Sequence, residues 1–230
     1  MGKVYLGFDP RLEREVAIKV LHGYSEETAQ RLRVEAKAAG RLNHPNIVVV
    51  HDIDASGGML FVVMEYVRGI TLEKFIKVNP RKVREQLPQI MSQVAAALDH
   101  AHEQQVVHRD VKPANIMIDG RGLVKVMDFG IAKMTADISV TPRGFIVGTP
   151  GYMAPEQING QMITGRSDQY ALGVMAYEVL TGSKPFEADT YLALFRKMGS
   201  AQEFAEVGIL GCFPEGDEFG LGHSHSLSFQ

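Results

Sequence analysis

The sequence predicts an α+β protein in which short strands come first and helices follow. The first 66 residues contain four short runs rich in β-branched and aromatic residues, each bounded by turn residues. From residue 71 onward, the longer segments repeat apolar residues at helical spacing. A loop crowded with charged side chains, residues 106–119, lies between two of these predicted helices. We therefore expect a small sheet followed by a mainly helical part.

The composition is that of an ordinary globular chain. Its 230 residues carry a net charge of -3, which indicates neither nucleic-acid binding nor an acidic-tail function. The single cysteine, Cys212, excludes an intrachain disulfide and fits a reducing compartment. No apolar run approaches the length of a membrane span, and the N-terminus does not resemble a signal peptide. We expect a cytoplasmic domain without a membrane segment; a membrane anchor elsewhere in the full-length parent is left open.

Two pairs of strands and one helix are predicted in the first part of the chain. The strands are residues 4–8, 15–21, 48–52 and 59–66. Turns at Asp9-Pro10-Arg11 and Ser56-Gly57-Gly58 connect the members of each pair. Between the pairs, residues 26–42 carry apolar side chains at helical spacing, with Ser25 as a candidate N-cap.

Four helices are predicted in the remainder: residues 71–78, 83–104, 167–182 and 190–198. Pro88 is expected in the first turn of the second helix or at a kink. His100 and His102, near the end of that helix, are expected to cap or pack rather than bind a metal, because no third ligand is nearby. The helix over 167–182 is apolar nearly all round, which predicts a buried position.

The charged loop carries side chains suited to phosphoryl transfer. Two β-branched runs, residues 106–107 and 116–118, bracket the loop and predict a short strand at each end. A loop held in this way leaves its polar groups free to meet a ligand. Together with one residue just beyond it, the loop supplies a carboxylate base, a cation and two oxygen ligands for a hard metal. These residues are Asp110, Lys112, Asn115 and Asp128.

The pattern His108-Arg109-Asp110-x-Lys112-x-x-Asn115, followed by Asp128-Phe129-Gly130, resembles the catalytic core of the eukaryotic-type (Hanks-type) protein kinases. Either motif alone is a weak signal, but here both occur in the order and spacing of that family. Lys112, two residues after Asp110, is typical of kinases that act on serine or threonine. The surrounding sequence is similar to the bacterial branch of the family.

The resemblance extends over residues 2–198 and implies a two-lobed, protein-kinase-like fold. Residues 1–66 would form the small lobe, an antiparallel sheet with one helix, in which the first strand and the start of the glycine-rich loop are missing. Residues 67–198 would form part of the mainly helical large lobe. Residues 199–230 have scattered glycines and weak periodicity, which predicts an irregular tail without a family match. Both lobes are therefore expected to be incomplete.

A nucleotide site is implied by the same resemblance. Lys19, at the end of the run Val-Ala-Ile-Lys, would bind the α- and β-phosphates and pair with Glu35. Without the resemblance, Lys19 would be an edge-strand lysine facing water and Glu35 a solvated helix charge. The residues implied to bind ATP are Gly2, Val4, Ala17, Lys19, Met64, Glu65, Val67, Asn115, Met117 and Asp128.

The catalytic roles are also carried over from the family. Asp110 would orient the substrate hydroxyl and accept its proton, while Lys112 and Lys19 would stabilise charge on the transferred group. Mg²⁺, or Mn²⁺ in its place, would bridge the ATP phosphates. The implied catalytic residues are Asp110, Lys112, Lys19 and Glu35, and the implied metal ligands are Asn115 and Asp128.

Residues 128–156 resemble a complete activation segment. Its hydroxyl groups are candidate phosphorylation sites: Thr135, Ser139, Thr141 and Thr149. Arg109, next to the base, is the cation that such a phosphate would reach. The alternative is that these hydroxyls are solvated turn formers without a regulatory role.

Two acidic residues are expected to be structural. Asp168 would be costly to bury alone, and in the family it accepts hydrogen bonds from the catalytic-loop backbone near His108 and Arg109. Glu156, at the end of the activation segment, is expected to be unpaired, because the sequence has no counterpart of the arginine that pairs with it in the family.

The resemblance implies a serine/threonine protein kinase that transfers the γ-phosphate of ATP to protein hydroxyls in bacterial signalling. Its partners would be ATP, protein substrates and, for autophosphorylation, a second copy of the chain; nucleic acid is not expected. One alternative is an inactive kinase fragment that serves only as a weak nucleotide- or protein-binding module. Another is a small-molecule phosphotransferase of related fold, against which the activation segment argues. The protein substrate, the activating signal and the oligomeric state are left open.

Overall fold

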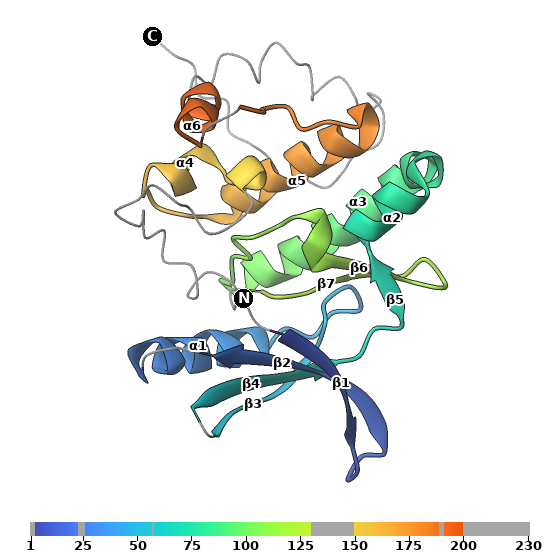
Figure 1. Cartoon of the computed structure of the whole chain (residues 1–230), viewed down its shortest axis with the longest axis vertical. Helices are drawn as coiled ribbons and strands as arrows, with labels where there is room; N and C mark the ends of the chain where they lie inside the picture. The colour runs from blue at the N-terminus through green and yellow to red at the C-terminus, as the bar shows by residue number, and fades with distance from the viewer. Residues whose placement is uncertain (1–2, 23–25, 57, 130–149, 189–190, 200–230) are drawn as a thin grey trace. The chain divides into compact units, whose positions relative to one another are not determined.

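The structure is a computed structural model that describes residues 3–22, 26–56, 58–129, 150–188 and 191–199. The chain divides into two units after Gly199, and all the described residues lie in the first of them. These residues form an antiparallel sheet with one helix, a second small sheet and a set of helices (Figure 1). The predicted α+β, kinase-like fold class is thereby confirmed, while the predicted division of the chain at residues 66 and 198 stays a prediction.

The larger sheet contains four antiparallel strands in the order β1-β2-β4-β3. The strands are β1 (Lys3–Asp9), β2 (Arg14–His22), β3 (Val50–Ser56) and β4 (Met59–Glu65). All four were predicted, although β3 begins two residues later and ends four residues later than expected. A register shift between Val50 and Asp52 marks the irregular start of this strand, where the hydrophobic run continues from the preceding loop.

The strand register determines which side chains share a face of this sheet. Lys19 lies opposite both Val4 on β1 and Val62 on β4, and Ala17, two residues earlier, lies opposite Met64. Directly opposed residues, and residues two apart on one strand, project from the same face. Lys19 therefore shares its face with Ala17 and Met64, which are two of the residues predicted to contact the nucleotide.

That face belongs to the main core of the first part of the chain. The buried members of the core are Leu21, Val48, Leu60, Val62, Met64 and Val67. Ala17 packs against them, as do Met117 and Met127 from the later part of the chain. Helix α1 (Glu26–Ala39) contacts β3 and buries the small side chains of Ala36 and Ala39. Apolar burial thus brings residues before and after residues 67–69, the hinge segment that follows β4, into one cluster.

The second sheet is small and carries the end of the catalytic loop. Its strands are β5 (Gly69–Thr71), β6 (Ile116–Asp119) and β7 (Val124–Val126), all antiparallel. A Cβ atom on Gly69 would lie 2.2 Å from the carbonyl oxygen of Ile118, so only glycine allows β5 to approach β6 this closely. Ile47, in the loop after α1, forms a parallel bridge with Val126 and so ties this loop to the second sheet.

Five more α-helices lie in the described residues: α2 (Leu72–Val78), α3 (Pro80–Glu103), α4 (Pro155–Ile158), α5 (Gly165–Thr181) and α6 (Tyr191–Gly199). Two short 3₁₀ helices, η1 (Pro113–Asn115) and η2 (Pro150–Tyr152), lie between them. Helix α3 begins at Pro80 rather than at residue 83, so Pro88 lies in its interior and not in its first turn. Pro88 is exposed, and water can therefore satisfy the carbonyl that its missing N–H leaves free. Thr164 caps the start of α5, and Gly182, with φ of 86°, ends it.

The strand predicted at residues 106–107 does not form. The chain leaves α3 through Gln105, whose φ is 60°, and the Val106 N–H donates to the carbonyl of Ala101. This N–H therefore pairs with a carbonyl near the C-terminal end of α3 and not with a neighbouring strand. The prediction was wrong because β-branched side chains also pack well in an extended segment without a partner strand.

Asn46, in the loop after α1, connects that loop to helix α3 and strand β7. Its side-chain nitrogen donates to Gln93 Oε1 at 2.9 Å and to the Val124 carbonyl at 2.8 Å, and its own carbonyl accepts from Val126 N–H. The side chain is buried. Both N–H groups are satisfied. Without them the Val124 carbonyl loses this donor, while Gln93 Oε1 keeps the hydrogen bond from the Val124 N–H.

We predict that Asn46→Ala lowers the free energy of unfolding by about 1–3 kcal/mol, because two buried hydrogen bonds are lost and each contributes about 0.5–1.5 kcal/mol. Urea unfolding followed by circular dichroism measures this change. Asn43→Ala, at an exposed position in the same loop, is the matched control and should change stability by less than about 0.5 kcal/mol. Equal effects of the two substitutions would contradict this role of Asn46.

Candidate active site

Asp168, in the first turn of α5, holds the backbone of the catalytic loop. Its side chain is 1% exposed and accepts the N–H groups of His108 at 2.9 Å and Arg109 at 2.7 Å. His102 Nε2 lies 2.7 Å from the same carboxylate. Arg109 has a φ of 68°, an unfavourable conformation for a residue with a Cβ atom. The predicted structural role of Asp168 is thus confirmed, and His102, which was expected to cap or pack, instead contacts this carboxylate through its ring nitrogen.

His108 connects the base to the residue that precedes Asp128. The Asp110 N–H donates to His108 Nδ1 at 3.2 Å, so the ring proton must be on Nε2, which donates to the Met127 carbonyl at 2.9 Å. The ring is buried and packs against Phe129, with 4.6 Å between the ring centroids. One imidazole therefore links the backbone at Asp110 to the backbone next to Asp128.

Asp110 is surrounded by the two other polar residues of its loop. Its Oδ2 atom lies 2.7 Å from Lys112 Nζ and accepts from Asn115 Nδ2 at 2.8 Å. The same nitrogen of Asn115 donates to the Asp110 carbonyl, also at 2.8 Å. Both side-chain contacts use Oδ2, and Oδ1 is thus the oxygen that can face a substrate hydroxyl.

Lys19 and Asp128 form an ion pair. Lys19 Nζ lies 2.8 Å from Asp128 Oδ2, and both side chains are largely buried. Asp128 has a φ of 66°, and the Met127 N–H before it donates to the Asn115 carbonyl at 3.0 Å. One connected set of contacts therefore joins Lys19, Asp128, Asn115 and Asp110.

Glu35 does not pair with Lys19, contrary to expectation. Its Oε1 atom lies 3.9 Å from Arg109 Nη1, and its Oε2 atom is buried without a hydrogen-bond partner. Burial raises the pKa of the Glu35 carboxyl, and the charge of Arg109 only partly opposes this. The physical reason for the difference is that Lys19 already contacts the carboxylate of Asp128, a residue that no local pattern places near it.

Four of the residues predicted to bind ATP belong to the core described above or pack against it. Met64 and Val67 are buried members of that core, and Ala17 and Met117 pack against it. Val4 lies on the same face but is 60% exposed. The Glu65 N–H donates to the Val49 carbonyl. Any backbone contact from Glu65 to an adenine would therefore use the Glu65 carbonyl.

The protein kinase domain model matches residues 1–211 of this chain. The chain belongs to the protein kinase domain family. It is 43% identical over 201 residues to the serine/threonine-protein kinase PrkC of Bacillus subtilis, covering 86% of this chain and 31% of that protein. It is 43% identical over 198 residues to PknB of Mycobacterium leprae, covering 83% and 32% of the two chains. The resemblance to bacterial kinases of the Hanks type is confirmed.

A third relative, the serine/threonine-protein kinase pkn3 of Myxococcus xanthus, is 43% identical over 209 residues, covering 86% of this chain and 38% of that protein. The chain spans about a third of the length of the curated relatives that it matches.

Lys125 is a polar residue of this kinase domain that the sequence analysis missed. It lies on β7, and its Nζ atom is 2.8 Å from Glu65 Oε2 and 3.4 Å from the Ile47 carbonyl. Glu65 Oε2 also accepts from Val49 N–H at 3.3 Å. The only signal in the sequence is that this lysine lies between two valines, Val124 and Val126. Both valines are buried in the strand, so the lysine side chain projects from the opposite face.

Gln157 is a second missed residue. Its side chain is buried, donates to the Arg109 carbonyl at 3.0 Å and accepts from Ala154 N–H at 2.9 Å. Its neighbour Glu156 accepts a hydrogen bond from Ser167 Oγ, so the expectation that Glu156 is unpaired was wrong. The partner of Glu156 is a serine on an adjacent helix, which only the packing of α4 and α5 could show.

Several predicted site residues lie outside the described residues. Gly2 of the glycine-rich loop is one of them. The candidate phosphorylation sites are the others: Thr135, Ser139, Thr141 and Thr149. Arg109 is described, and its side chain is 41% exposed and therefore accessible to a phosphate. The regulatory role of these residues stays a prediction.

Asn115 and Asp128 suit a divalent cation. Because Asn115 Nδ2 donates twice to Asp110, the amide oxygen Oδ1 is left as a ligand. A carboxylate and an amide oxygen are the hard ligands that Mg²⁺ prefers, with phosphate oxygens and water completing its shell. No cluster of three His, Cys, Asp or Glu side chains lies within the described ranges. His100 stacks on His44 instead.

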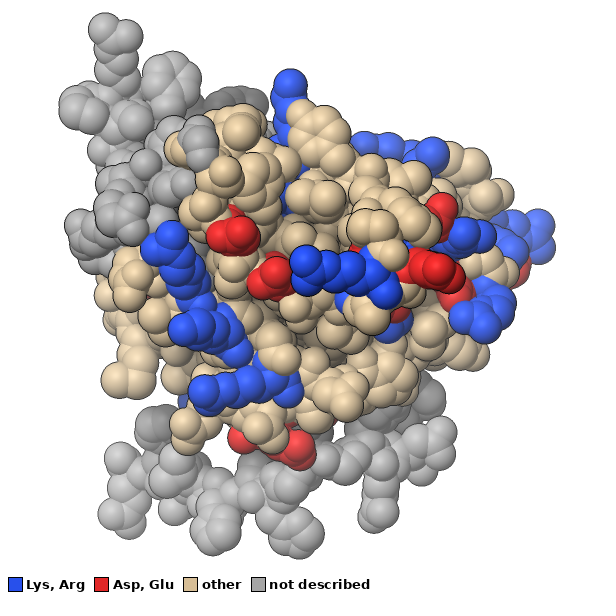
Figure 2. Space-filling view, turned by 90° about the horizontal axis from the view of Figure 1, so that it is seen from below, with Lys and Arg blue, Asp and Glu red and all other residues tan. Residues whose placement is uncertain are grey.

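The face of the molecule seen from below has mixed charge. The face shown in Figure 2 carries Lys and Arg side chains together with Asp and Glu, with uncharged residues between them. Such mixed surfaces are typical of solvated faces rather than of a nucleic-acid site. None of the helices in the described part of the chain is long and apolar enough to cross a bilayer.

We predict that Glu35→Gln stabilises the nucleotide-free protein, and more so at pH 8 than at pH 4. The pKa of Glu35 is raised in the folded state, so wild-type stability falls as the pH rises through that pKa; glutamine cannot ionise and avoids this loss. Thermal unfolding at both pH values measures the difference. Glu103→Gln, at an exposed position, is the control and should show no such pH dependence. A variant less stable than wild type at pH 8 would contradict the prediction.

Proposed function

We propose that this domain is a serine/threonine protein kinase that transfers the γ-phosphate of ATP to hydroxyl groups of proteins. The observation that carries the proposal is the connected set of contacts from Lys19 through Asp128 and Asn115 to Asp110. It brings one amine, two carboxylates and an amide together from both parts of the chain. The names of the relatives, all serine/threonine-protein kinases, support the same activity.

In the proposed mechanism, Asp110 binds the substrate hydroxyl through Oδ1 and accepts its proton as the phosphoryl group is transferred. Lys112, held 2.7 Å from Asp110, stabilises the negative charge that develops on the transferred group. Lys19 would also stabilise negative charge, by binding the phosphates that lie closer to the adenosine. Catalysis would then consist mainly of positioning and of fixed charge.

The proposed cofactors are ATP and Mg²⁺, with Mn²⁺ able to replace it. Asp128 and Asn115 would hold the cation, whose chemistry is to neutralise and orient the phosphates. Ala17, Met64 and Met117 would enclose the adenine, and the roles of Glu65 and Val67 would be backbone contacts at the hinge. Glu35 would exchange Arg109 for Lys19 when the nucleotide binds, because phosphate oxygens draw Lys19 away from Asp128.

The proposed partners are protein substrates and a second copy of the chain for autophosphorylation. Lys112 supports serine and threonine as acceptors, through the family resemblance. The domain would work in the cytoplasm, where its ATP is available. Since the chain spans about a third of its relatives, the signalling role and any membrane anchor of the full-length protein are part of this proposal.

Asp110→Asn tests the assigned base. We predict that it lowers the rate of phosphate transfer to a basic protein by about 10³-fold, because an amide cannot accept the proton. Transfer of labelled phosphate in the presence of Mg²⁺ is the measurement, with circular dichroism to verify folding. Asp99→Asn, at an exposed position of α3, is the matched control. Activity that survives Asp110→Asn would refute the base.

Asp128→Asn tests the metal site. We predict that it raises the Mg²⁺ concentration needed for half-maximal transfer by about tenfold or more, because a charged ligand becomes neutral. Removing the cation with EDTA should stop transfer by the wild type, and Mg²⁺ should restore it. An unchanged Mg²⁺ dependence in the variant would show that Asp128 is not a ligand.

The same assays separate the alternatives. An inactive binding module would be folded and would transfer no phosphate under any of these conditions. A small-molecule phosphotransferase would label aminoglycosides or choline but not a peptide mixture. If the domain is a protein kinase, serine and threonine in the peptides will be labelled and the small molecules will not.

A further inference from the structure

The peptide unit between Arg109 and Asp110 is held by hydrogen bonds at both of its polar groups. Its N–H donates to His108 Nδ1 at 3.2 Å, and its carbonyl accepts from Gln157 Nε2 at 3.0 Å. The next carbonyl, that of Asp110, accepts from Asn115. His108 and Asn115 belong to the catalytic loop itself, whereas Gln157 belongs to α4. The orientation of the peptide directly before the proposed base therefore depends on a side chain from outside the loop.

The amide of Gln157 acts as a donor and an acceptor at the same time. Its Oε1 atom accepts from Ala154 N–H at 2.9 Å, which ties the side chain back to the residue before α4, and Nε2 is then directed to the Arg109 carbonyl. Gln157 is 4% exposed, which leaves little room for water in place of either partner. Glutamate has the same shape but, when ionised, supplies acceptors only.

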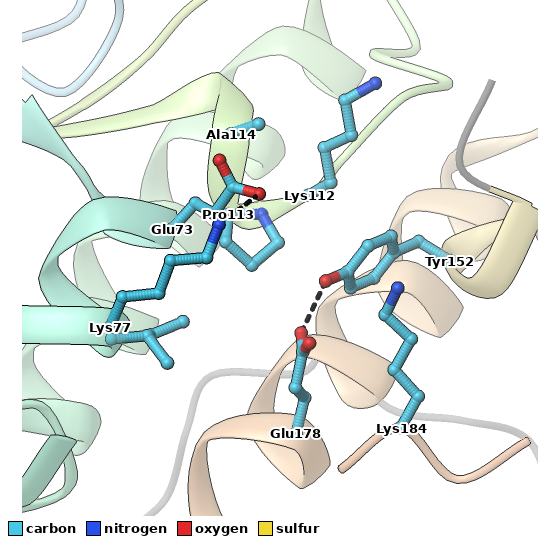
Figure 3. A pocket seen from close by; sticks show the side chains of 9 residues that line it. Glu73, Lys77, Lys112, Pro113, Ala114, Tyr152, Glu178 and Lys184 are labelled. Atoms are coloured by element: carbon cyan, nitrogen blue, oxygen red, sulfur yellow. Dashed lines mark hydrogen bonds and ion pairs between the residues drawn. The ribbon is translucent and has the colours of Figure 1, made fainter. Parts of the chain in front are cut away.

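The segment from η2 to α4 is fastened to α5 at two points. The Tyr152 hydroxyl, in η2, donates to the carboxylate of Glu178 (Figure 3), and Ser167 Oγ donates to Glu156. Helix α5 also carries Asp168, which accepts from two N–H groups of the catalytic loop. The loop is thus held from α5 by two routes, directly through its N–H groups and through one of its carbonyls by way of α4.

The backbone of the loop is strained at the residue whose carbonyl Gln157 binds. Arg109 has a φ of 68°, which is unfavourable for a residue with a Cβ atom. A relaxation of this angle to its usual negative range would move the Arg109 carbonyl away from Gln157 and carry Asp110 with it. A displacement of about 1 Å at a reacting group lowers the rate by about 10²-fold.

We propose that Gln157 is a positioning residue for the catalytic base: it holds the Arg109 carbonyl and so sets the direction in which Asp110 meets the substrate hydroxyl. The inference rests on the proposed kinase function and adds a residue of α4 to it. Lys19 and Asp128, which are proposed to bind the nucleotide and the cation, form the contacts described above with other residues. Loss of the Gln157 hydrogen bond should therefore slow phosphate transfer without weakening the binding of ATP.

Two variants of similar size test this role. Gln157→Glu retains an acceptor for Ala154 N–H but places an oxygen against the Arg109 carbonyl, and Gln157→Met removes both hydrogen bonds. Each should slow a single turnover of phosphate transfer to a basic protein, at saturating ATP and Mg²⁺, by about 10- to 100-fold. The affinity for a non-hydrolysable ATP analogue, measured by titration calorimetry, should stay within about twofold of the wild-type value.

Gln169→Met, at an exposed position of α5, is the matched control and should change neither the rate nor the affinity. Thermal unfolding shows whether each variant is folded.

Transfer by both variants at the wild-type rate would overturn the inference and leave the kinase activity standing. So would a fall in rate with an equal loss of affinity for the ATP analogue, or unfolding of both variants, because either result shows a general structural role. A wild type that transfers no phosphate would overturn both the inference and the proposed function.

Discussion

The catalytic loop depends on one buried carboxylate. Asp168 accepts three hydrogen bonds, two of them from consecutive N–H groups of the loop. The left-handed backbone at Arg109 costs about 1–3 kcal/mol. Each hydrogen bond to a charged acceptor contributes about 1.5–3 kcal/mol, so the two backbone bonds outweigh that cost. These hydrogen bonds therefore hold the catalytic loop in a conformation that an isolated peptide would not keep. The position of Asp110 depends on that conformation.

The charges of the site are paired with one another in this structure. Asp128 contacts Lys19, Asp110 contacts Lys112, and Glu35 lies nearest to Arg109. The weakest of these contacts is that of Glu35, at 3.9 Å and with one oxygen unsatisfied. A carboxylate with one unsatisfied oxygen gains more from a new cationic partner than a carboxylate that is already paired. Phosphate groups that attract Lys19 would break its contact with Asp128 and leave Asp128 to a cation.

Strand β7 is tied to the first part of the chain at three points. Val126 bridges to Ile47, Asn46 bonds to the backbone of this strand, and Lys125 pairs with Glu65 at the hinge. Asp128 follows two residues after this strand ends. The position of the residue proposed to hold the metal is therefore coupled to the hinge and to the loop after α1 by backbone and side-chain contacts rather than by apolar packing alone.

The sequence by itself determined the order and type of most elements, because strand alternation and helical periodicity are local. It also determined the residue types of the site, since the spacing from His108 to Asn115 lies within one loop. Only the tertiary structure decided the partners: Lys19 lies beside Asp128 rather than Glu35, and Glu156 has Ser167. The roles of Lys125 and Gln157 became visible only there, as did the hydrogen bond from Val106 N–H to the end of α3. These outcomes depend on contacts between residues far apart in the chain, and no local pattern encodes such distances.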